Sequence, residues 1–231
     1  MLDGLLASTG LVGEPAEDFG EVFETQALPK TGRSGLSDHL VGCARRAGDT
    51  GVHATKLHLH QQELFLHLLR LLRGAHGLTD AELIAAVFPQ PRYVWLKRED
   101  AVAQAVSWWR ASQSAQWIDS DVVRREPDFD FHKIDAAVKR TRELNDRWHS
   151  WFSTNRIVPL VITYEGLVAD PGRVVREILS FAGVEAPSGM LVSARTSRQA
   201  DALSDEWIER YRSLAVASDE TRRRTDVSTV S

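Results

Sequence analysis

The sequence predicts an α/β fold in which a parallel sheet is flanked by helices. Residues 93–96 form a continuous apolar run bounded by prolines and charges, which is typical of a strand buried on both faces, and residues 157–164 are a further strand. A shorter strand is predicted at Val52–Leu57, after the Asp49-Thr50-Gly51 turn. Helical patterns occupy the stretches between the strands, and strands that alternate with helices form covered parallel sheets.

Apolar side chains at helical spacing predict most of the helices, and capping residues mark where several begin. Thr79 and Glu82 form a capping-box pattern, and Asp170-Pro171 precedes another apolar period. The expected helices are 2–9, 36–47, 60–73, 80–87, 99–117, 131–153, 171–182 and 204–214.

The remaining proline, glycine and polar residues predict where further elements and the domain itself begin and end. Gly13-Glu14-Pro15 predicts the start of a further helix, with Glu17 and Asp18 in its first turn. Residues 28–35 are expected to form a loop, because they combine proline, glycine and serine. The polar C-terminus predicts a disordered tail, so we expect one domain over 1–215 and a tail over 216–231.

Composition excludes several classes of function. Twenty-eight basic against 32 acidic residues give the 231-residue chain a net charge of −4, which offers no basic field for nucleic acid. Cys43 is the single cysteine, so no internal disulfide can form. No leader pattern and no apolar stretch of about 18–20 residues is present. We therefore expect a cytoplasmic protein without a membrane span.

An anion site is predicted where the apolar run at residues 93–96 ends. Arg98 follows that strand, and Ser107 lies on the next helix. Ligands of α/β sheets bind at the carboxyl ends of the strands, and a guanidinium with a hydroxyl suits a phosphate group. A solvated strand-end arginine and a surface serine are the alternative.

A later segment resembles the sulfotransferases that use 3′-phosphoadenosine 5′-phosphosulfate (PAPS). It runs Ile162-Thr163-Tyr164-Glu165-Gly166-Leu167, then Asp170-Pro171, an amphipathic helix, and Phe181-Ala182-Gly183-Val184. The resemblance implies a P-loop-NTPase-like fold, with Arg98 and Ser107 at the 3′-phosphate of the donor.

Further motifs are similar to the trehalose 2-sulfotransferase family. They are residues 9–19, residues 104–111 with Trp117, and residues 198–201 with 204–211. The likeness runs from about Leu2 to about Arg212. It implies transfer of a sulfonate group from PAPS to a hydroxyl of a sugar or a glycosylated small molecule, with PAP (adenosine 3′,5′-bisphosphate) as the product. It also implies a homodimer and no metal cofactor.

The resemblance assigns roles to individual residues. Glu17 matches the proposed general base, and Glu14 lies beside the acceptor sugar. Lys56 matches a lysine near the active site, where a cation stabilises sulfonate oxygens. Arg198 matches a basic residue that reaches the 3′-phosphate. The alternatives are that Glu14 and Glu17 complement a helix N-terminus, and that Lys56 is a solvated strand-end lysine.

The chain departs from this family at its start. Family members begin with an apolar strand and an Arg-Ser-Gly-Ser/Thr loop, whereas Met1 here falls inside the helix that follows. Residues 32–35 are similar in sequence to that Arg-Ser-Gly-Ser/Thr loop, but they follow the Gly-Glu-Pro motif instead of preceding it. We therefore expect an ordinary loop there. We expect the in-frame codons upstream to encode the strand and loop. If Met1 is the true start, a non-catalytic nucleotide- or partner-binding protein becomes the leading interpretation.

A metal-dependent hydrolase is the alternative from another class. His53, His58, His60 and His67 lie close together in the sequence. However, no ligand motif such as His-Glu-x-x-His accompanies them, and carboxylates are sparse in this stretch. Solvated or core histidines explain them better.

Overall fold

The structure of the protein is a computed structural model that describes residues 2–20, 28–73, 77–114, 126–190, 192 and 202–228. The chain divides into two compact units. The first unit comprises Met1–Lys97 and Trp148–Arg195, and the second comprises Arg98–Arg147 and Thr196–Ser231. Among the described residues, two clusters of buried hydrophobic side chains lie in the first unit and one lies in the second. The single domain expected over 1–215 stays a prediction.

A small parallel sheet lies in the first unit. Strand β1 (Val94–Lys97) pairs with β2 (Leu160–Thr163), in the register Val94↔Leu160 to Lys97↔Thr163. Both predicted stretches therefore contain strands, but the second is strand over four residues only. The oxygen Oγ1 of Thr163 accepts from the amide of Gly166 at 3.0 Å, and this cap starts helix α7 (Tyr164–Ala169).

The predicted strand Val52–Leu57 is wrong as a strand of the sheet. The segment is extended, but within the described residues its β pairing is limited to one isolated parallel bridge, between Ala16 and Thr55. Its backbone partners come from residues 13–16, and this pairing is too short to form a strand.

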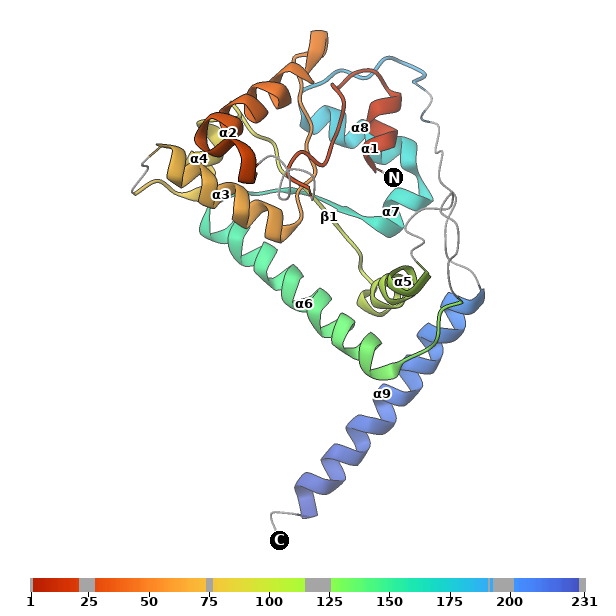
Figure 1. Cartoon of the computed structure of the whole chain (residues 1–231). Helices are drawn as coiled ribbons and strands as arrows, with labels where there is room; N and C mark the ends of the chain where they lie inside the picture. Colours follow the sequence, from red (N-terminus) through yellow and green to blue (C-terminus); the bar gives the residue numbers. More distant parts are fainter. Residues whose placement is uncertain are drawn as a thin grey trace. The chain divides into compact units, whose positions relative to one another are not determined.

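One hydrophobic core of the first unit lies under helices α1 (Leu2–Ser8) and α8 (Pro171–Phe181), which lie side by side in Figure 1. Asp170 begins α8 as predicted, because its Oδ1 accepts from the amide of Arg173 at 2.8 Å. The buried members of this core are Leu5, Leu6, Val12, Ile162, Leu167, Val174, Val175, Ile178 and Leu179.

A second core joins helices α2 (Leu28–Arg45), α3 (Leu59–Arg73) and α4 (Asp80–Ala85). Helix α2 begins at Leu28, so the loop expected over 28–35, including 32–35, is wrong. A proline is tolerated in the first turn, and each glycine costs a helix about 1 kcal/mol relative to alanine. Burial of Leu36 and Cys43 along the same helix offsets that cost.

The second unit is built from α5 (Ala101–Ser114), the first part of α6 (Phe131–Thr154) and α9 (Ala202–Ser228). Trp207 and Tyr211 of α9 are buried in its core, and the hydroxyl of Tyr211 donates to Oδ1 of Asp135 at 2.8 Å. Helix α9 extends to Ser228, through the range where the sequence predicts a disordered tail. Residues 213–228 contain neither glycine nor proline, which would end a helix. Within the described ranges, no helix is long and apolar enough to cross a membrane.

Candidate functional site

The segment that carries Glu14 and Glu17 lies along residues 52–56 in the first unit. Gly13 donates to the carbonyl of Val52 at 2.8 Å, and Lys56 donates to that of Ala16 at 2.8 Å. The helix expected after Pro15 does not form over residues 15–20, because these backbone groups pair with the neighbouring segment instead. Gly13 is required there, since an added Cβ would lie 1.9 Å from the carbonyl oxygen of Arg46.

Three side chains meet the carboxylate of Glu17. Lys56 Nζ lies 2.9 Å from Oε2, and Gln61 Nε2 donates to Oε1 at 2.8 Å. His58 Nε2 lies 3.4 Å from Oε1. The structure therefore brings Glu17 and Lys56 together, although they are far apart in the sequence. The side chain of Glu17 stays 37% exposed, so a substrate can reach it.

The electrostatics keep Glu17 ionised. Burial works to raise the pKa of its carboxyl, but the hydrogen bonds from Gln61 and Lys56 and the charges of Lys56 and His58 lower the pKa overall. Burial lowers the pKa of His58. A carboxylate that is ionised at neutral pH and open to solvent can accept a proton from a substrate hydroxyl.

Glu14 lies three residues before this carboxylate and is exposed. Its amide donates to the carbonyl of Arg46 at 3.1 Å, which ties its backbone to the end of α2. Among the described residues, its carboxylate has no hydrogen-bond or ion-pair partner. It is therefore available to a polar ligand.

Asp18 anchors the same segment from the opposite side. Its side chain is 1% exposed, accepts from the guanidinium of Arg46, and lies 2.8 Å from His53 Nε2. Burial works to raise the pKa of this carboxyl, but hydrogen bonds from His53 and Thr55 and the nearby positive charges lower it overall. Asp18 is therefore a buried anion held by the guanidinium of Arg46 and a ring nitrogen of His53.

Asp18, His53 and Cys43 offer ligand atoms within 4.8 Å of one another, so we tested the cluster as a metal site. The guanidinium of Arg46 donates to Asp18 and, at 3.2 Å, to Sγ of Cys43. Burial raises the pKa of the Cys43 thiol to about 11, so the thiol is protonated at neutral pH. A resident guanidinium and a protonated thiol disfavour a metal ion.

The histidine cluster behind the hydrolase interpretation does not converge on one point. His53 faces Asp18, whereas the rings of His58 and His60 stack on each other at 6.0 Å. His67 is exposed on α3. This arrangement does not support the metal-dependent hydrolase.

Arg98 precedes α5 and Ser107 lies on it, and both belong to the second unit. Nη1 of Arg98 donates to the carbonyl of Ala103 at 3.3 Å, and Ser107 is one helical turn beyond Ala103. Asp100 caps the helix, because its Oδ1 accepts from the amides of Val102 and Ala103 at 3.0 Å. The guanidinium of Arg98 is thus held beside the first turn of α5.

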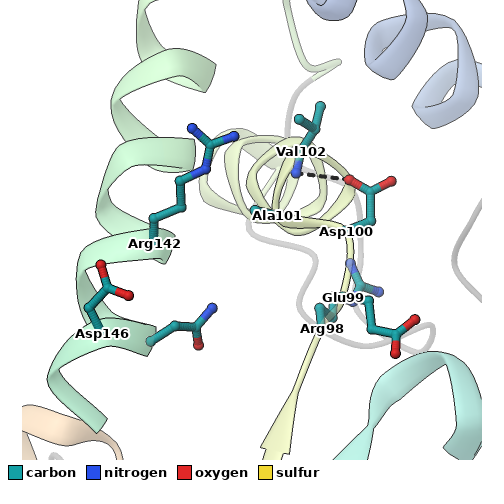
Figure 2. Close-up of a pocket in the computed structure, with 8 residues that line it drawn as sticks. Arg98, Glu99, Asp100, Ala101, Val102, Arg142 and Asp146 are labelled. Atoms are coloured by element: carbon teal, nitrogen blue, oxygen red, sulfur yellow. Dashed lines mark hydrogen bonds between the residues drawn. The ribbon is translucent and has the colours of Figure 1, made fainter. Parts of the chain in front are cut away.

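A pocket of about 430 Å³ opens beside the start of α5, within the second unit (Figure 2). Arg98 and Arg142 supply its positive charges, and Asn145 adds an amide. Sequence reasoning missed Arg142. The pattern that could have indicated it is the helical spacing of Arg142, Asn145 and Asp146, which places these polar side chains on one face of a long helix. The lining residues are Arg98, Glu99, Asp100, Ala101, Val102, Arg142, Asn145 and Asp146. Two other predicted residues, Arg198 and Trp117, lie outside the described residues.

Comparisons with known proteins bear on the chemistry of these sites. A family model described as Stf0 sulphotransferase matches residues 1–214. The chain is 30% identical over 226 residues to a trehalose 2-sulfotransferase of Mycobacterium tuberculosis (strain ATCC 35801 / TMC 107 / Erdman), covering 91% of this chain and 82% of that protein. It is 32% identical over 241 residues to a trehalose 2-sulfotransferase of Mycolicibacterium smegmatis, covering 90% and 87%.

Proposed function

The chain belongs to the Stf0 sulphotransferase family and is a sulfotransferase, and we propose that it transfers the sulfonate group of PAPS to a hydroxyl of trehalose or a similar glycoside. The observation that carries the proposal is the ionised, accessible carboxylate of Glu17 paired with Lys56 at 2.9 Å. The P-loop-NTPase-like form of the fold, a homodimer and a cytoplasmic location are parts of the same proposal, supported by family membership alone.

In the proposed reaction, Glu17 accepts the proton of the acceptor hydroxyl while that oxygen forms its bond to sulfur. The bond between sulfur and the 5′-phosphate oxygen breaks, and its electron pair leaves with PAP. Lys56 stabilises the charge on the transferred sulfonate oxygens. Glu14, whose carboxylate is exposed, accepts hydrogen bonds from other hydroxyls of the sugar.

A transfer assay tests the proposed function. Incubation with ³⁵S-labelled PAPS and trehalose is expected to give a labelled disaccharide and one equivalent of PAP. Glucose, maltose and sucrose are the comparison acceptors, and they define the class of sugar. PAP that binds in a titration, together with no transfer to any acceptor, would instead indicate a non-catalytic nucleotide-binding protein.

We propose that Arg98, Ser107 and Arg198 hold the 3′-phosphate of the donor. Arg98→Ala is then expected to weaken PAP binding at least about tenfold, because a hydrogen bond to a charged group contributes about 1.5–3 kcal/mol. Binding of adenosine 5′-monophosphate, which lacks the 3′-phosphate, should change little. Calorimetric titration of both nucleotides measures the difference.

Arg140→Ala is the matched control for that titration. Arg140 is exposed on α6 of the same unit and does not line the pocket. It should leave both affinities unchanged. Equal weakening of the two nucleotides by Arg98→Ala would remove the assignment of Arg98 to the 3′-phosphate.

A further inference from the structure

The side chain of Gln61 connects the candidate base to helix α3. It is buried, with 3% of the residue exposed, in the first turn of that helix. Its Nε2 donates to Oε1 of Glu17 at 2.8 Å, and its own Oε1 accepts from the amide of His58 at 2.8 Å. Both ends of the amide are thus engaged, so the side chain cannot rotate without losing two hydrogen bonds.

These contacts fix the orientation of the Glu17 carboxylate. Gln61 holds Oε1 and Lys56 holds Oε2, so rotation about the last side-chain bond is blocked from both sides. A carboxylate has about four lone-pair positions, and the acceptor hydroxyl can use one that these two donors leave open. Lys56 is a flexible, 43% exposed side chain, whereas Gln61 is buried and held at both ends.

We infer that Gln61 is a positioning residue for the sulfuryl transfer, holding Oε1 of Glu17 so that the carboxylate faces the acceptor hydroxyl. The inference rests on the proposed function of Glu17 as the general base. A role limited to capping α3 would use only the oxygen of the Gln61 amide, which accepts from His58. The nitrogen donates to the carboxylate of Glu17, a contact that a helix cap does not need.

The neighbouring residue shows that burial by itself does not create such a contact. Gln62 is also buried in α3, with 2% exposed, but within the described residues its Nε2 has no hydrogen-bond partner. The two glutamines therefore have the same chemistry and similar burial, and differ in their contact with Glu17. This makes Gln62 a matched control.

The charges around Glu17 give the inference a readout other than stability. The groups that face the carboxylate are Lys56, His58 and, beyond Lys56, Asp3 of α1 at 3.8 Å from Nζ. The Gln61 hydrogen bond is among the causes that hold the pKa of Glu17 below its usual value. Removing that donor is therefore expected to raise the pKa, so that the base becomes protonated at a higher pH.

The experiment compares three variants of the full chain: Gln61→Leu, Gln61→Glu and Gln62→Leu. Gln61→Leu is expected to lower kcat about tenfold with the KM for PAPS unchanged, and to move the acidic side of the kcat/KM profile to higher pH. Gln61→Glu keeps the shape of the side chain and places a second carboxyl beside Glu17. It should therefore move the acidic side of the kcat/KM profile to a still higher pH. Gln62→Leu should leave the profile in place.

A direct titration separates this inference from the proposed function. The carboxyl carbon of Glu17 is followed by ¹³C NMR in glutamate-labelled protein, with the signal assigned by its loss in Glu17→Gln. A pKa of Glu17 that is the same in wild type, Gln61→Leu and Gln61→Glu would overturn the inference, whatever the activity. A raised pKa of Glu17 in the Gln61 variants, combined with full activity of Glu17→Gln, would confirm the contact between Gln61 and Glu17. It would also show that Glu17 is not the general base, which refutes the proposed function of this residue.

Discussion

Glu17→Gln is expected to lower kcat by about 10²–10⁴-fold, which is the usual contribution of a general base. Glutamine keeps the size of the side chain and can still receive the hydrogen bond from Gln61, but it cannot take the proton of the acceptor. Affinity for PAP should change little. Steady-state kinetics with saturating trehalose, together with titration of PAP, measures both quantities.

Glu14→Gln is the companion variant for this measurement. Because the Glu14 carboxylate is proposed to bind the sugar, its loss should raise the KM for the acceptor more than it lowers kcat. If Glu17→Gln retains a rate within a few-fold of wild type while Glu14→Gln loses most of it, the roles of the two glutamates must be exchanged.

Asp18→Ala is expected to destabilise the first unit by about 3 kcal/mol, because it leaves the charge of Arg46 and the ring nitrogen of His53 without their buried partner. We take the lower end of the usual range because the side chain of Arg46 is 30% exposed and water screens it in part. Urea unfolding followed by tryptophan fluorescence measures the change. Asp38→Ala, at an exposed position of α2, should stay within about 0.5 kcal/mol of wild type.

The pH dependence of stability offers a second check on Asp18. A carboxyl whose pKa is lowered in the folded state stabilises the protein above its ordinary pKa of 3.8. That stabilisation is lost as the pH falls through the lower folded value. The free energy of unfolding should therefore fall less steeply below pH 3.8 in Asp18→Ala than in wild type. Identical slopes would mean that Asp18 does not stabilise the fold as an anion.

Local signals predicted those elements whose ends are set by neighbouring residues. The capping box of α4 forms as expected, with the amide of Glu82 donating to Thr79 Oγ1 at 3.2 Å and that of Thr79 donating to Glu82 Oε2 at 2.7 Å. The cap of α8 at Asp170 was predicted for the same reason. Such caps depend on side chains within three residues, which the sequence displays directly.

Local signals failed where distant partners decided the structure. The proline and acidic residues after Gly13 favour a helix start, but residues 52–56 take the backbone groups that a helix would need. Residues 28–35 have the composition of a loop, but α2 runs through them because its later residues pack into the core. In each case tertiary contacts outweigh propensities of about 1 kcal/mol or less per residue.

The sequence by itself determined the α/β class, the two paired strands and most helices, because periodicity and caps are local properties of the chain. Its motifs also predicted a sulfotransferase, and the family comparison bears this out. Only the tertiary structure decided which groups meet Glu17. Gln61 and His58 follow Glu17 by more than 40 positions in the sequence. Gln61 lies 2.8 Å and His58 3.4 Å from the Glu17 carboxylate, because residues 13–16 pair with residues 52–56. No local pattern encodes such a contact, since it depends on the packing of separate elements into one core.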